Sequence, residues 1–275
     1  MLSLAAALVY GAADFCGGLA TKRTPSLVVA LLSQTIGFAV LLVALPFTPG
    51  RGVPADYLFG ALAGICGAIA IALLYHALSI GKMGIVSPIT AVIAAAFPLV
   101  FGIVRGEHLA LAQIVGLILA LVAIVTVSLS FEPPATRAGA IAGVREAIAT
   151  GLLFGGFFIL LSYTHRAAGL HSLLAARMVS IPLLLLVALL ARAKLAPYRS
   201  DWPLIAACGV MDMGANVLYV LATFNGYLAI VAVLTSLYPA STVLLARFVL
   251  NERLTRIQKT GVAIAIAGVL LISLR

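Results

Sequence analysis

The sequence has little charge. Only 9% of its 275 residues are Asp, Glu, Lys or Arg, and 64% are hydrophobic, whereas a soluble domain carries roughly a quarter of charged residues. So few charged side chains cannot cover the surface of a chain of this length in water. The composition therefore excludes a water-soluble domain and predicts a protein that folds in a lipid bilayer.

Cysteine and histidine are also scarce, and their positions exclude common metal and disulfide arrangements. Cys16, Cys66 and Cys208 lie inside apolar runs without C-x-x-C spacing, so they indicate neither a zinc site nor a disulfide framework. The four histidines show no metal-ligand spacing. The net charge of +9 is spread over short segments and predicts no nucleic-acid partner. We expect no metal and no cofactor.

Long apolar runs, in contrast, are present along the whole chain. In lipid the backbone must pair internally, which leaves helices or a closed barrel, and barrel strands are short and alternating. A helix needs about 20 apolar residues to span the bilayer. We therefore predict an all-α integral membrane fold with about ten spans, at residues 2–20, 26–46, 56–78, 85–104, 111–130, 145–163, 170–191, 202–223, 229–250 and 257–274.

The chain repeats itself at an offset of 145 residues. The matches that composition does not explain pair Gly81 with Gly226, Glu107 with Glu252, Gln113 with Gln258, Gly116 with Gly261 and Ser128 with Ser273. This divides the chain into a first five-helix repeat at 1–130, a linker at 131–144 and a second repeat at 145–275. Five crossings per half place the second half in the membrane upside down, so the repeat is inverted, as in many secondary transporters.

Three segments carry a family resemblance: 78–88 (LSIGKMGIVSP), 211–219 (MDMGANVLY) and 236–254 (SLYPASTVLLARFVLNERL). The chain resembles the drug/metabolite transporter superfamily, EamA type. The resemblance implies ten helices, of which helices 1 to 4 and 6 to 9 surround a central cavity while helices 5 and 10 pack outside. It also implies a small-molecule substrate, because members carry amino acids, other metabolites and drugs.

A polar stripe interrupts the apolar span at 202–223. Asp212, Asn216, Tyr219 and Thr223 follow at i, i+4, i+7 and i+11, which places them on one face of a helix. The stripe either lines the substrate cavity, where Asp212 binds a cationic group or carries a proton, or joins helices by hydrogen bonds. We expect substrate binding or coupling here.

Three further residues are candidates for the same site. Arg177 lies at nearly the depth of Asp212, so we expect either an ion pair or a snorkelling side chain. Asp14, about six residues from the end of its span, faces the cavity or the interface. Tyr75, which matches Tyr219 at an offset of 144 in the upstream part of the repeat, gates or lines the cavity or anchors the membrane interface.

Glu107 and Glu252 stand at helix ends, where we expect them to cap the following helix or pair at the surface.

The function that fits these observations is secondary transport, by an exporter of small metabolites, amino acids or drugs that works by alternating access. We expect a multi-pass protein of the plasma or inner membrane, with a small-molecule substrate, the bilayer and protons as partners. The alternatives are a membrane enzyme acting on lipid phosphates and a structural membrane subunit. An enzyme would need an acid, Arg, Ser or His cluster near one interface, and none is visible.

The orientation of the termini stays open at this stage. Eleven Lys and Arg residues flank the connections after the first, third, fifth, seventh and ninth spans, and four lie on the side of the termini. The positive-inside rule therefore places the termini outside. The family resemblance implies cytoplasmic termini.

Overall fold

A computed structural model describes residues 1–48, 50–80, 83–128, 143–250 and 255–273, and confirms the all-α membrane fold. The first half contains α1 (Leu2–Ala20), α2 (Ser26–Ala44), α3 (Pro54–Ile80), α4 (Met83–Val104) and α5 (Leu111–Ser128). The second half contains α7 (Val144–Ser162), α8 (His171–Leu190), α9 (Trp202–Thr223), α10 (Leu228–Thr235), α11 (Tyr238–Val249) and α12 (Arg256–Ser273). The linker expected at 131–144 falls largely outside the described residues.

Nine helical segments in the described part of the chain are long and apolar enough to cross a membrane, and α4 adds a tenth apolar helix. The ninth expected span, 229–250, is wrong as a single helix, because α10 and α11 are separated at Ser236 and Leu237. Pro239 occupies the first turn of α11, where its missing N–H does no harm, whereas inside a continuous helix it would remove a hydrogen bond. The break lies about halfway through the span.

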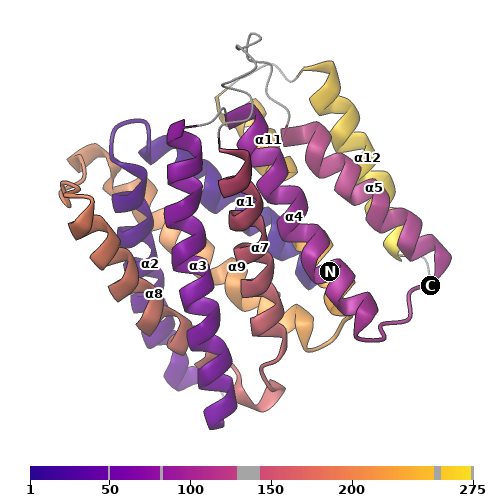
Figure 1. Cartoon of the computed structure of the whole chain (residues 1–275), viewed down its shortest axis with the longest axis horizontal. Coiled ribbons are helices and arrows are strands. Elements are labelled where there is room, and N and C mark those ends of the chain that lie inside the picture. Colours follow the sequence, from indigo (N-terminus) through magenta and orange to yellow (C-terminus); the bar gives the residue numbers. More distant parts are fainter. Residues whose placement is uncertain (49, 81–82, 129–142, 251–254, 274–275) are drawn as a thin grey trace.

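The helices alternate between two faces of the molecule. On one, which we call the terminal face, lie the start of α1, the end of α12 and the connections at 45–48, 50–53, 105–110, 163–170 and 224–227. On the other, the linker face, lie the connections at 21–25 and 191–201. In Figure 1 the terminal face is at the bottom and the linker face at the top. This arrangement is the inverted repeat that the five-helix halves predict.

The packing units are not the sequence halves. Helix α3 packs against α7 and α8, while its repeat partner α9 packs against α1 and α2. We define the first bundle as α1, α2, α9, α10 and α11, and the second bundle as α3, α4, α7 and α8. Each bundle thus combines two helices of one half with the third and fourth of the other. Helices α5 and α12 pack on each other at one edge (Figure 1).

Glycine makes the closest helix contacts possible in both bundles. A Cβ on Gly64 would collide with the carbonyl oxygen of Ala176 in α8, and a Cβ on Gly209 would collide with that of Ser33 in α2. These two glycines are 145 residues apart, so the same kind of close glycine contact occurs in both halves. Small residues allow this approach because in lipid helices associate by van der Waals packing.

Candidate functional site

Arg177 and Asp212 form an ion pair near the middle of the membrane. The Arg177 Nη2 donates to Asp212 Oδ2 at 2.5 Å, which confirms the predicted pairing and excludes a snorkelling Arg177. Arg177 is buried and Asp212 is half-buried. Because α8 belongs to the second bundle and α9 to the first, the pair bridges the two bundles. The charge of Asp212 is thereby neutralised inside the protein.

Asn216 extends this pair by one helical turn. Its Nδ2 donates to the Asp212 carbonyl oxygen at 2.8 Å and approaches Asp212 Oδ2 at 3.3 Å. The side chain is buried, and its Oδ1 has no hydrogen-bond partner among the described residues. A buried acceptor without a partner is costly, so Asn216 is a polar group that a further donor would satisfy.

The other half of the stripe belongs to an apolar core. Tyr219 is fully buried, its hydroxyl donates to the Phe158 carbonyl oxygen at 2.9 Å, and its ring lies 4.5 Å from that of Phe158. The Thr223 hydroxyl donates within its own helix to Val220. Tyr219 and Phe158 share a buried cluster with Leu161, which packs the space between the bundles toward the terminal face.

Asp14 lies in α1, which packs against α9. Its side chain is exposed, as is Gly18 one turn closer to the linker face. Among the described residues Asp14 makes no hydrogen bond or ion pair, and it lies close enough to Asp212 in α9 and to Tyr238 in α11 for electrostatic interaction. Asp14 therefore borders the same region as the Arg177–Asp212 pair.

Two tyrosines complete this region and were not predicted from the sequence. Tyr10 lies one turn before Asp14, and Tyr238 begins α11 at the helix break; their ring centroids are 6.4 Å apart. The spacing of Tyr10 from Asp14 is a signal that the sequence contains, whereas the position of Tyr238 depends on the break. Tyr75 lies within α3, and its side chain falls outside the described part of the structure.

Polar contacts near the terminal face join the two bundles. The Glu107 carboxylate accepts from the backbone N–H groups of Leu228 at 2.7 Å and Ala229 at 2.9 Å. The expectation that Glu107 caps the following helix is therefore wrong: it caps α10 of the other half, because the fold brings the end of α4 beside that helix. Arg166 donates to Asn225 and to the Phe224 carbonyl oxygen. Glu252 lies outside the described residues.

Each bundle is held together by one buried acid, and the two acids match across the repeat. Asp56 accepts from the His165 backbone N–H at 2.8 Å, and its Oδ1 lies 3.0 Å from His165 Nδ1. Asp201 accepts from the Thr24 hydroxyl at 2.8 Å. The two acids are 145 residues apart, a match that the sequence contains and that we did not single out. Each joins one half to the first connection of the other.

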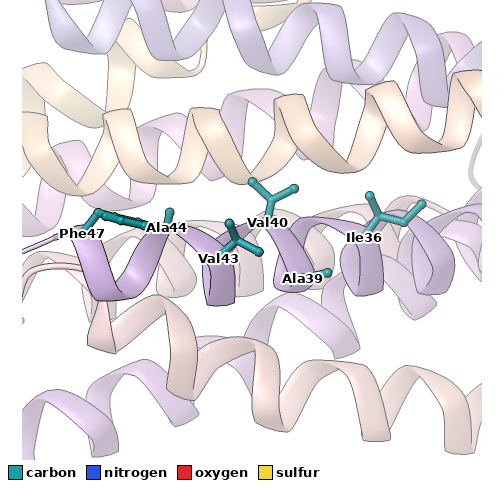
Figure 2. Close-up of a pocket in the computed structure, with 6 residues that line it drawn as sticks. All are labelled: Ile36, Ala39, Val40, Val43, Ala44 and Phe47. Atoms are coloured by element: carbon teal, nitrogen blue, oxygen red, sulfur yellow. The ribbon is translucent and has the colours of Figure 1, made fainter.

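Two hollows of the molecular surface are lined by none of these charged residues. One of about 500 Å³ is lined only by apolar side chains of α2 and the 3₁₀ turn after it (Figure 2). Another of about 380 Å³ is lined by apolar residues of α1, α2 and α9, on the face of α9 opposite Asp212. Both are open to the outside and have no polar lining, so they suit lipid acyl chains and not a polar substrate.

The inverted pair of five-helix halves agrees with a direct comparison of the sequence. The model of the EamA-like transporter family matches residues 1–129 and 141–274. The chain belongs to the EamA-like transporter family. A solved crystal structure shares the EamA-like fold of this chain with a TM-score of 0.82 over 99% of this chain and 96% of the other, at 18% identity. No curated protein matches the chain.

Family membership makes this a multi-pass membrane protein of a transporter family, as the sequence predicted. Within the described residues no group of three or more His, Cys, Asp or Glu side chains is placed to hold a metal ion. In this EamA-like chain a charged and aromatic region lies where the two bundles meet. It is formed by Asp14, Tyr10, Arg177, Asp212 and Tyr238.

Proposed function

We propose that this EamA-like protein is a secondary transporter that exports small metabolites, amino acids or drugs by alternating access. The observation that carries the proposal is the Arg177–Asp212 pair near Asp14. Ionisable side chains within the membrane cost free energy, and those that occur usually mark a substrate or ion path. We place the protein in the plasma or inner membrane.

The moving parts in this proposal are the two composite bundles. Each has tight internal packing, with glycine contacts at Gly64 and Gly209 and an acid tie at Asp56 or Asp201. Contacts between the bundles combine apolar packing, as of Tyr219 on Phe158, with polar contacts such as the Arg177–Asp212 pair. Two inverted units of similar structure give inward-open and outward-open states of similar energy.

Proton coupling through Asp14 and Asp212 is part of the proposal. Both carboxylates lie at membrane depth, and the groups that face them are Arg177, Tyr10, Tyr238 and Cys208. A carboxylate in such a place alternates between a proton and another cation, which links substrate movement to the proton gradient.

The test is export from cells with and without the protein, using a panel of amino acids, amines and drugs, followed by uptake into proteoliposomes with an imposed proton gradient. We expect accumulation to depend on the protein and to collapse when the gradient is removed. Transport that ignores the gradient and is unchanged in both Asp14→Asn and Asp212→Asn would remove the coupling. The absence of transport for the whole panel would remove the function.

A further inference from the structure

The charges in the central region do not balance. Among the described residues, the acids that lie in the helices away from their end turns in this region are Asp14 and Asp212, and the base is Arg177, which pairs with Asp212. Arg177 is committed to Asp212 at 2.5 Å. The three groups together therefore carry one unit of negative charge when all are ionised, and it resides on Asp14.

The depth of Asp14 prevents it from reaching either membrane surface. It lies six residues before the end of α1, which at 1.5 Å per residue is about 9 Å below the linker face. An aspartate side chain is too short to snorkel over that distance, unlike the long stems of Lys and Arg. Asp14 and Gly18, which lie one turn apart on α1, are both exposed, so protein atoms do not enclose the carboxylate.

The side chains next to Asp14 are aromatic. Tyr10 lies one turn deeper on the same face of α1, and Tyr238 faces it from α11 with the ring planes inclined at 58°. A carboxylate near aromatic rings suits an ammonium group, since the carboxylate supplies the opposite charge and the rings attract a cation without requiring hydrogen bonds. A substrate carboxylate would find no free base here, because Arg177 is already paired.

We propose that Asp14, with Tyr10 and Tyr238, binds the positively charged amine of the substrate, so that the transported molecules are organic monocations with an apolar body. The bound amine restores neutrality to the region. The Arg177–Asp212 pair and Asn216 supply further polar groups in the same region. This inference rests on the proposed transport function and selects a class within its range of substrates.

The test compares amines with their acetylated forms. Phenethylamine, tryptamine and octylamine are each paired with the N-acetyl derivative, which keeps the apolar body and removes the charge, and L-phenylalanine supplies the zwitterion. Binding to the purified protein in nanodiscs and uptake into proteoliposomes are both measured. We expect at least one amine to be bound and moved, about tenfold or more better than its acetyl form, as loss of a charged contact predicts.

Variants locate the charge that matters. Asp14→Asn is expected to lose about tenfold in amine affinity, Asp14→Glu to retain most of it, and Tyr238→Phe to retain it as well because the ring face stays. Glu146→Gln, which removes an acid from the first turn of α7, is the matched control and should bind as the unaltered protein does.

Two kinds of outcome overturn the proposal. Equal handling of amines and acetyl derivatives, or transport of L-phenylalanine with none of the three amines bound, rejects the cation site while transport itself stands. If Asp14→Asn does not fold, the comparison of amines with acetyl forms on the unaltered protein still decides. No movement of any tested compound removes the transport function and the site with it.

Discussion

The two faces of the molecule are built on the same plan but are not equally closed. On each face one buried acid, Asp56 or Asp201, ties the first connection of the opposite half into a bundle. The terminal face also carries contacts between the bundles, from Glu107 to α10 and from Arg166 to Asn225, above the buried ring of Tyr219. Toward the linker face, Asp14 and Gly18 are exposed.

This difference shows which contacts hold a bundle together and which hold a conformation. Each bundle has one such acid contact, from Asp56 or Asp201. This is expected if the two bundles are related by inverted symmetry and each moves as a unit. Toward the linker face the bundles also meet, through apolar packing of Leu31 in α2 with Leu184 and Ala188 in α8, whereas the terminal face adds the polar contacts of Glu107 and Arg166. Exchanging these contacts is what alternating access needs.

The largest effect on stability is expected for the Arg177–Asp212 pair, which lies between the two faces. Arg177→Leu leaves the half-buried Asp212 without its partner and should lower stability by about 3 kcal/mol, near the lower end for a broken buried pair. Asp212→Asn added to Arg177→Leu should recover part of that loss, because no charge is then left alone. The midpoint of thermal unfolding in detergent measures both. A double variant no more stable than the worse single variant would contradict the pairing.

The contact specific to the terminal face is the next test. Glu107→Gln leaves one acceptor oxygen for the two N–H groups at the start of α10, so one hydrogen bond is lost and the other loses its charge assistance, at a cost of about 2 kcal/mol in all. We expect the terminal face to open more often, so that a cysteine introduced at Thr223 in a cysteine-free background is labelled several-fold faster. Asp56→Asn is the matched control, because it alters a tie within one bundle. Equal acceleration by both variants would show that Glu107 is not a contact between moving parts.

The smallest effect should be shared by the two faces. Asp56→Asn and Asp201→Asn each remove the charge from a buried acceptor at the start of a helix, and each should cost about 1 kcal/mol. Because the two acids serve equivalent bundles, their thermal unfolding midpoints should fall by similar amounts. A fall confined to one variant would mean that the bundles are not equivalent in stability, despite their matched acids.

Much of the fold could be predicted because it follows from local composition. Apolar runs of membrane length predict helices wherever they occur, and the match of Glu107 with Glu252 predicts the repeat. The break between α10 and α11 was missed, because a proline such as Pro98 in α4 stays within a helix whereas Pro239 begins a new one. That choice depends on what packs against the freed backbone.

The candidate site could be predicted only in part, for a similar reason. Helical spacing places Asp212 and Asn216 on one face, and similar depth predicts the partner of Asp212 in Arg177. The same spacing groups them with Tyr219, which the structure places in an apolar core. Periodicity gives the face of a helix but not whether that face meets water or another helix.

The sequence by itself determined the membrane fold, the ten apolar helices and the inverted repeat, because these depend on the local balance of apolar and polar residues and on the number of crossings. The tertiary structure decided that helices from the two halves mix into composite bundles, that Glu107 caps a helix of the other half, and that Asp14 and not Asp212 retains an uncompensated charge. These features depend on which side chains meet across helices distant in sequence, and pairing of one carboxylate with a single available arginine necessarily leaves the other without a counter-ion.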